Sequence, residues 1–338
     1  MTNPFIIDIL EQPAAVRRAV ERFDTPALAG TRASGFERVV ITGMGSSLHA
    51  GYIAWLTLAR AGVPAWHIDA GELLHQASDL VNKRTLLIMI SQSGRSAEIL
   101  ELLDKVVPGR LICITNDTSS PLAECSQAVV QMHAGDEATV SSKTYTTTLA
   151  VAQLAARQLA GQSLDAPRAE LIQATDTMAH YLEGWRDRVA QLSSAVGVPQ
   201  RFVIIGRGSS LAAVHTAALI LKEGAKVQAE GLGAGQFRHG PLELTDERLT
   251  ALILAGEGKT RPLNERLASE LRGYGANTHT VGTSGTGGVA DIVCPTAHGA
   301  GLPVVEIIPL QLLVVALAEA TGIVPGQFRY SGKVTTTQ

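Results

Sequence analysis

The stretch VITGMGSSL at residues 40–48 is nearly repeated as IIGRGSSL at residues 204–211. Each copy is an apolar run, typical of a buried strand, that leads into the same Gly-x-Gly-Ser-Ser-Leu turn. The two copies lie about half a chain apart in a sequence of 338 residues. A repeat of that length is too long for a solenoid and is typical of a duplicated domain.

The next strand of each half shows where the copies differ. Residues 90–96 read ISQSGRS, whereas the matching residues 254–260 read LAGEGKT. Only the first half keeps a turn rich in hydroxyl groups. We therefore expect two domains of one fold, of which only the first holds a hydroxyl-lined binding site.

The composition is that of a globular α/β protein with no general attraction to nucleic acid or lipid. Hydrophobic residues make up 46% of the chain, and the net charge is −3 without a basic cluster. No stretch approaches the roughly 18 uninterrupted apolar residues of a membrane span, and residues 1–4 lack the basic start of a signal peptide. We expect a cytoplasmic enzyme or binding protein with neither nucleic acid nor membrane as partner.

The three cysteines, Cys113, Cys125 and Cys294, show no paired spacing. In a reducing cytoplasm such residues are typically buried free thiols. We expect no disulfide, no metal ion and no cofactor.

Apolar strands alternate with helical stretches through both halves. The strand candidates are residues 38–42, 85–90, 110–114, 202–206, 249–254, 278–281 and 303–307, and the helical candidates are residues 6–23, 47–61, 94–106, 146–194 and 309–321. This alternation predicts parallel strands joined by right-handed crossovers. The expected fold class is α/β, with two tandem doubly wound parallel sheets in flavodoxin-like α/β/α sandwiches. The expected division is a helical lead-in, a first domain, a helical connector, a second domain and a polar tail (1–35, 36–165, 166–194, 195–322 and 323–338).

The serine-rich turns are the candidate anion site. Ligands of an open α/β sheet bind beyond the carboxyl ends of the strands, where N–H groups at helix starts favour a phosphate. Hydroxyl groups in the first half would add donors around one anion: Ser47, Ser91, Ser93 and Ser96. A dinucleotide site is disfavoured because Gly43-x-Gly45 lacks the third glycine and the acidic ribose ligand. The alternative is that these serines only cap helices.

A second candidate cluster lies in the second half. Glu223 ends an apolar helical stretch, where an acid is costly unless it is used or paired. His239 lies between an arginine and a Gly-Pro turn. A carboxylate and an imidazole are the groups that proton transfer and ring opening of a sugar require. The alternatives are a surface glutamate and a histidine that stabilises the turn.

Lys333 is the third candidate, the sixth residue counted back from the end, in a polar tail. A lone tail lysine is usually solvated. A lysine folded into a pocket could instead form a Schiff base with a ketose.

In order along the chain, these motifs resemble the double SIS (sugar isomerase) family, in particular the isomerase half of glucosamine-6-phosphate synthase and its stand-alone deaminase relatives. The resemblance covers nearly the whole chain. Its motifs are residues 11–13, 45–47, 91–94, 140–146, 221–223, 229–230, 239–241 and 333–335.

The resemblance implies a phosphosugar substrate and assigns roles to these residues. The phosphosugar would be held by Gly45, Ser46, Ser47, Ser91, Gln92, Ser93, Ser96 and Ser142. Glu223 would move a proton between C1 and C2, His239 would catalyse ring opening, and Lys333 would lie beside the open-chain carbonyl. Because the family's histidine usually comes from the neighbouring subunit, a homodimer with its active site at the subunit interface is implied.

Departures from the synthase pattern narrow the expected reaction. The chain begins Met1-Thr2, where the synthase begins with the cysteine of a glutaminase domain, so we expect no glutaminase activity. Arg95 replaces an acid, as in some stand-alone deaminases, Thr216 replaces an acid on the Glu223 helix, and residues 325–329 depart from an Asp-x-Pro-Arg stretch. The expected enzyme is a glucosamine-6-phosphate deaminase. A fructosamine-6-phosphate deglycase, a simple aldose–ketose isomerase and a non-catalytic sugar-phosphate sensor remain alternatives.

Overall fold

The computed structural model describes residues 3–23, 26–283, 290–330 and 332–335. Contacts between Cα atoms divide the chain into two compact units. Unit 1 comprises Met1–Pro13, Ala138–Ser142 and Gln173–Arg329, and unit 2 comprises Ala14–Glu137, Lys143–Ile172 and Tyr330–Gln338.

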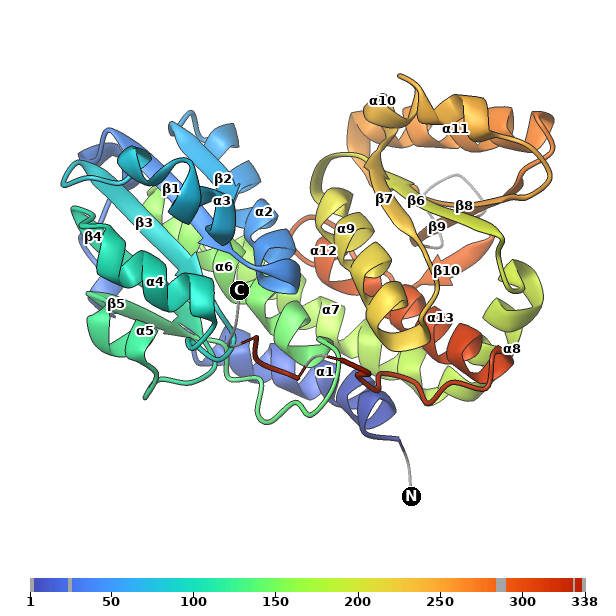
Figure 1. The fold of residues 1–338 in the computed structure, drawn as a ribbon, viewed down its shortest axis with the longest axis horizontal. Helices are drawn as coiled ribbons and strands as arrows, with labels where there is room; N and C mark the ends of the chain where they lie inside the picture. The colour runs from blue at the N-terminus through green and yellow to red at the C-terminus, as the bar shows by residue number, and fades with distance from the viewer. Residues whose placement is uncertain (1–2, 24–25, 284–289, 331, 336–338) are drawn as a thin grey trace. The chain divides into compact units, whose positions relative to one another are not determined.

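Unit 2 is built on a five-stranded parallel sheet in the order β2-β1-β3-β4-β5 (Figure 1). This order is that of a flavodoxin-like doubly wound sheet. All six residues of the central strand β3 are buried, as expected for a strand covered on both faces. The strands are β1 (Arg38–Gly43), β2 (Ala65–Asp69), β3 (Thr85–Ile90), β4 (Arg110–Thr115) and β5 (Ala128–Gln131).

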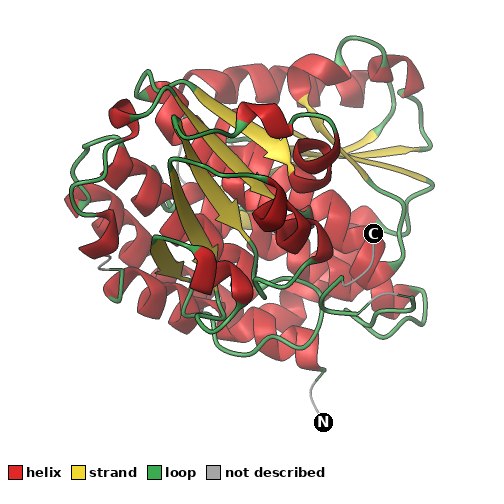
Figure 2. Cartoon of the chain, turned by 60° about the vertical axis from the view of Figure 1, so that its left-hand side comes forward, coloured by secondary structure: helices red, strands yellow, loops and turns green. Residues whose placement is uncertain are grey.

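Helices cover both faces of this sheet; Figure 2 draws the strands of both units in yellow and the helices around them in red. One face packs its apolar side chains, among them Val40, Leu87 and Leu111, against α3 (Ala70–His75), α4 (Ala97–Lys105) and α5 (Pro121–Cys125). The opposite face is covered by α2 (Gly45–Arg60) and α6 (Lys143–Leu159), which pack against each other.

Unit 1 repeats the topology, with the strand order β10-β9-β8-β6-β7. Taken in chain order from β6, this is the arrangement of unit 2 seen from the other end of the sheet, and all the pairings are parallel. The duplication inferred from the two Gly-x-Gly-Ser-Ser-Leu turns is therefore confirmed. The strands are β6 (Arg201–Gly206), β7 (Glu230–Gly233), β8 (Leu249–Leu254), β9 (Asn277–Thr283) and β10 (Ile292–Cys294).

The helices of unit 1 also form two layers. The side chains of Val203, Ile205 and Ile253 face a core shared with α10 (Ala234–Phe237) and α11 (Arg261–Gly273). On the other side lie α8 (Trp185–Val196), α9 (Leu211–Ile220), α12 (Leu302–Val305) and α13 (Ile307–Ala320). The lead-in helix α1 (Pro4–Glu21) and helix α7 (Asp165–Glu183) each contribute residues to both units.

Three kinds of predicted feature need correction: one strand, four missed edge strands and one cysteine. Residues 303–307, expected to be a strand, form α12 and the start of α13, because an apolar β-branched run fits a fully buried helix as well as a strand. The strands β2, β5, β7 and β10 were not predicted, since they are short. Cys125 is exposed rather than buried, because it ends the short helix α5, whereas Cys113 and Cys294 are buried.

One segment of the described chain, Leu302–Ala320, is long and apolar enough to pass a test for a membrane span. Within this segment, 94% of an 18-residue apolar window is buried in the protein, as is typical of the core helix of a globular domain.

Candidate functional site

Two turns leave the carboxyl ends of neighbouring strands in unit 2. Strands β1 and β3 pair in parallel, with Gly43 opposite Ile90. A Cβ atom on Gly43 would lie 2.7 Å from the Ile90 carbonyl oxygen, so a side chain here would push the strands apart. The turn after β1 (residues 44–47, the β1 turn) and the turn after β3 (residues 91–96, the β3 turn) therefore begin side by side, where a doubly wound sheet binds its ligands.

The β1 turn supplies the start of helix α2. Gly45, Ser46 and Ser47 are its first three residues, and Gly45 has a φ of 51°. The first N–H groups of a helix lack acceptors within the helix and favour an anion. The N–H of Ser47 already donates to the Met44 carbonyl at 3.0 Å, so the contribution of Ser47 to a ligand is its hydroxyl.

The β3 turn holds its serine hydroxyls in place through backbone hydrogen bonds. The Oγ of buried Ser91 accepts the N–H of Gly94 at 3.1 Å, and the Oγ of Ser93 accepts the N–H of Arg95 at 3.2 Å. The hydroxyls of Ser91 and Ser96 are 3.5 Å apart. Because a hydroxyl that accepts a bond still carries a proton of its own, Ser91 and Ser93 remain donors for a ligand.

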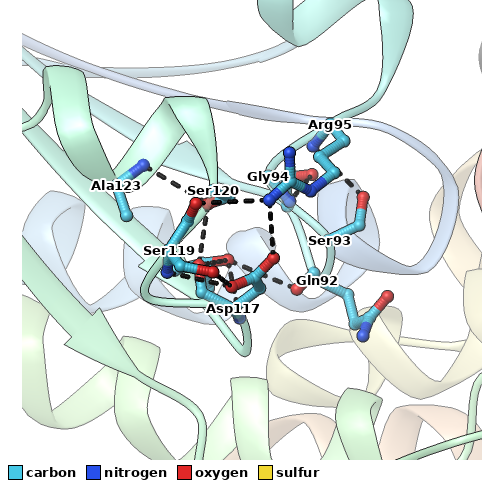
Figure 3. A network of polar contacts seen from close by, with 10 residues as sticks. Gln92, Ser93, Gly94, Arg95, Asp117, Ser119, Ser120 and Ala123 are labelled. Atoms are coloured by element: carbon cyan, nitrogen blue, oxygen red, sulfur yellow. Dashed lines mark hydrogen bonds and ion pairs between the residues drawn. The ribbon is translucent and has the colours of Figure 1, made fainter.

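The β3 turn is fixed to the segment that follows β4 (Figure 3). Gly94 has a φ of 61°, and a Cβ atom on it would lie 2.1 Å from the Oγ of Ser120, so this position requires glycine. Arg95 pairs with Asp117 at 3.1 Å and donates to the Ser119 carbonyl at 3.2 Å. Hydrogen bonds from Ser119, with Arg95 adding to them, lower the pKa of Asp117. The side chain of Gln92 extends away from this network in Figure 3.

The alternative that these serines serve only as caps does not match the described contacts of Ser96. Ser96 occupies the N-cap of α4, yet its side chain makes no capping hydrogen bond among the described residues. Ser120 does cap its helix, because its Oγ accepts the N–H of Ala123 at 3.4 Å. The chain thus distinguishes a capping serine from serines held in the turn.

The tail brings Lys333 to the same part of unit 2. Its ammonium pairs with the carboxylate of Glu137, and the Thr335 carbonyl accepts the N–H of Ala97, next to Ser96, at 3.2 Å. Glu137 was missed by sequence reasoning, because it lies in a polar loop of no regular pattern. Its place just before the motif of residues 140–146 is the only hint that the sequence offers.

Unit 1 holds the remaining predicted residues. Glu223 lies, half-buried, in a π-helical turn (Leu221–Ala225) that extends α9, and such turns are frequent at functional sites. His239 is exposed just after α10, where its backbone N–H donates to the Gln236 carbonyl at 2.9 Å. Ser142 is fully buried directly before α6.

The matching turns of unit 1 are lined by carboxylates. Ser210, the counterpart of Ser47, donates its hydroxyl to Glu306 at 2.8 Å, and both residues are fully buried. Glu257, the counterpart of Ser93, accepts the N–H of Gly299 at 3.1 Å. Burial raises the pKa of Glu306 to about 8, and the nearby charge of Glu257 adds to the rise. In the sequence, the single acid within the apolar run VVEII (residues 304–308) could have indicated that Glu306 is buried and hydrogen-bonded.

The described residues of both units place no three His, Cys, Asp or Glu side chains where they could hold a metal ion. What unit 2 offers instead is a set of hydroxyl and N–H donors, which suits an oxyanion rather than a cation.

Comparison with known proteins gives a consistent result. A family model described as SIS domain matches residues 35–158 and 198–317, together more than half of the chain. The glutamine–fructose-6-phosphate aminotransferase (isomerizing) of Pyrococcus horikoshii is 30% identical over 343 residues, which cover 98% of this chain and 57% of that protein. The chain therefore spans little more than half the length of this curated relative.

Solved structures show the same likeness. The C-terminal domain of glucosamine-fructose-6-phosphate aminotransferase from Francisella tularensis has a TM-score of 0.86 at 25% identity, covering 97% of this chain and 99% of that chain. Glucosamine-6-phosphate deaminase from Thermotoga maritima has a TM-score of 0.81 at 22% identity, covering 98% and 99%. The second likeness shows the fold alone.

Proposed function

The chain belongs to the SIS domain family, and from this premise we propose that it is a sugar-phosphate isomerase that releases ammonia, a glucosamine-6-phosphate deaminase. We further propose that it is a cytoplasmic enzyme. It would need neither a cofactor nor a glutaminase domain, because proton transfer and hydrolysis complete the reaction.

The observation that carries this proposal is the pair of adjacent turns in unit 2. Their hydroxyl and N–H donors come from two neighbouring strand ends and two helix starts. The proposed phosphate ligands are Gly45, Ser46, Ser47, Ser91, Gln92, Ser93 and Ser96, with Ser142 as a further contact to the sugar. A dianionic phosphate bound by several charge-assisted hydrogen bonds would fix the sugar for chemistry at its other end.

The proposed chemistry opens the sugar ring, moves a proton from C2 to C1 and exchanges nitrogen for oxygen at C2. His239 assists ring opening by moving the proton of the C1 hydroxyl to the ring oxygen, so that the bond between C1 and the ring oxygen breaks and a C1 aldehyde forms. The carboxylate of Glu223 then removes the proton from C2 and returns it to C1. A second proton passes from the C2 amine to the C1 carbonyl oxygen, so that C1 becomes a CH2OH group and the C2 amine becomes an imine. Water adds to this imine and ammonia leaves, so that an amino-aldose phosphate and water become a ketose phosphate and ammonia.

The exposure of His239 supports the proposal that the enzyme works as a homodimer. A solvent-exposed histidine on a loop can reach the substrate of a second copy, as the family resemblance implies. Mixing inactive Glu223→Gln and His239→Asn proteins tests this directly. Mixed dimers that regain activity would support a shared site, whereas mixtures that stay inactive after subunit exchange would count against it.

The function is tested by incubating the protein with a panel of amino-sugar, glycated-amine and plain sugar 6-phosphates. We expect glucosamine 6-phosphate to yield equal amounts of ammonia and ketose phosphate. Turnover only of glycated amines would identify a deglycase, and interconversion without ammonia would identify an isomerase. Binding of a sugar phosphate without turnover of any panel member would contradict an enzymatic role and favour a sensor.

A further inference from the structure

Glu137 is a buried carboxylate with an unusual set of partners. Its side chain is 0% exposed, although an isolated charge is very costly to bury. The N–H of Thr144 donates to Oε1 at 3.0 Å, and the Thr144 hydroxyl donates to Oε2 at 2.6 Å. Thr144 is the second residue of α6, so the carboxylate also lies at the positive end of a 17-residue helix.

The same carboxylate pairs with the ammonium of Lys333, a residue nearly 200 positions later in the chain. Two residues further on, the Thr335 carbonyl accepts the N–H of Ala97 at the start of α4. The tail is thus held at a side chain and at the backbone, and both contacts lie within unit 2. Ala97, which makes this backbone contact, directly follows Ser96 of the β3 turn.

We propose that Glu137 is the positioning residue of Lys333, and that it presents the lysine as a fixed ammonium beside the serine turns. The anchoring follows from the contacts within unit 2, whereas its part in turnover rests on the proposed function. An ammonium bound to a buried carboxylate is a preorganised hydrogen-bond donor, which stabilises negative charge as it develops on a substrate oxygen. Lys333 then acts through its charge, and no Schiff base is required.

Limited proteolysis with trypsin measures how firmly the tail is held, and it needs no substrate. Trypsin cleaves after lysine and arginine in segments that open locally, so the release of residues 334–338 reports how often the tail leaves its place. Glu137→Gln keeps an acceptor for Thr144 but removes the charge that binds Lys333. We expect cleavage after Lys333 to become roughly ten- to a hundredfold faster in this variant, because a buried ion pair has lost one partner.

Two controls make this measurement specific. Thr144→Val removes the hydroxyl bond to Glu137 but keeps the ion pair, so we expect a smaller increase in cleavage. The rate of cleavage after Arg329, measured in the same digest, normalises for general unfolding. Should Glu137→Gln fail to fold, Glu137→Asp shortens the carboxylate's reach while keeping its charge. Equal cleavage after Lys333 in the wild type and in the folded Glu137 variant would overturn the proposal.

Kinetics then separate this proposal from the proposed function. With a substrate found in the panel, Glu137→Gln and Lys333→Met should lower kcat by a similar factor and leave KM within about twofold, since phosphate binding is untouched. The double variant should be no slower than either single variant, and Glu137→Asp should restore part of the loss. Wild-type kcat in Glu137→Gln would refute the positioning role while the enzyme assignment stands. Absence of turnover in the wild type would refute the enzyme assignment, and the proteolysis result would still decide the anchoring.

Discussion

The turns of the two units keep the same backbone and carry opposite chemistry. Gly45 and Gly208 have φ angles of 51° and 60°, and Gly94 and Gly258 have φ angles of 61° and 58°. The side chains next to these glycines differ: Ser93, directly before Gly94 in unit 2, matches Glu257, directly before Gly258 in unit 1. After duplication, the backbone was retained because it shapes the turn, while the side chains decide whether the turn can hold an anion.

Ser47 and Ser210 occupy matching positions of the two units. The surroundings of these two serines differ although the residue type is the same. In unit 1 the hydroxyl of Ser210 is committed to the buried carboxyl group of Glu306. The Glu306 carboxyl group thus accepts the hydrogen bond that the matching hydroxyl of unit 2, on Ser47, would donate to a ligand under the proposed function. A negatively charged group entering the turn of unit 1 would also meet Glu257. We infer that the turns of unit 1 no longer suit an anion, whereas Glu223 of the same unit is the proposed proton shuttle.

The largest expected effect tests this division of labour. Glu223→Gln should lower kcat by about two to four powers of ten, because the variant loses its proton shuttle. The KM should change little, since the proposed phosphate ligands lie in unit 2. Glu319→Gln, which alters an exposed acid of unit 1 outside the family motifs, serves as the matched control and should keep wild-type turnover. Near-normal kcat in Glu223→Gln would show that this glutamate is structural.

The two matching serines give a sharper contrast, because the same substitution should have different consequences. Ser47→Ala should weaken binding of a sugar phosphate by about 1–3 kcal/mol, the value of a hydrogen bond to a charged group, and should leave stability nearly unchanged. Ser210→Ala should lower the free energy of unfolding by about 1–3 kcal/mol, because the buried Glu306 loses its donor, and should leave KM unchanged. Steady-state kinetics and urea unfolding of both variants measure this. Equal loss of affinity in both would mean that both halves bind the anion.

A smaller effect concerns the pH dependence of stability. The pKa of Glu306 is about 8 in the folded protein, well above its value in the unfolded chain, so the folded state binds a proton that the unfolded state releases. The free energy of unfolding should therefore fall as pH rises toward 8, by about 1 kcal/mol per pH unit. Glu306→Gln, which keeps an acceptor for Ser210, should remove this slope. Urea unfolding at several pH values between 5.5 and 8 decides the point. Parallel slopes in the variant and the wild type would mean that Glu306 is ionised in the folded state.

The smallest effect is expected at the ion pair that supports the β3 turn. Arg95 and Asp117 are partly exposed, and water screens such pairs so that they contribute little. Arg95→Ala and Asp117→Asn should therefore raise KM only a few fold at neutral pH. Because the pKa of Asp117 is lowered in the fold, the ion pair should hold at neutral pH and weaken only in acid. A large loss of kcat in Arg95→Ala would instead assign the guanidinium to the substrate.

The repeated turns predicted the fold because the residues that determine a turn and the strand before it are neighbours in the sequence. Glycines at fixed offsets and apolar runs identified the central strands to within a residue or two. The short edge strands β5 and β10 leave too few residues for a pattern, and residues 303–307 fit a helix as well as a strand. The π-helical turn at Glu223 and the Glu137–Lys333 pair depend on contacts between distant segments, which no local pattern contains. The roles proposed for the residues of the serine turns, for Glu223, His239 and Ser142, and for Lys333 all stay predictions.

Soaking a crystal of the protein in inorganic phosphate tests most directly the claim that only one of the two duplicated turns holds an anion. We predict density for one phosphate per chain, among the donors of the β1 and β3 turns, and none at residues 256–260. The same soak of Ser93→Ala should show weaker density, whereas Ser210→Ala should match the wild type. Phosphate bound equally in both units, or only at residues 256–260, would contradict the account.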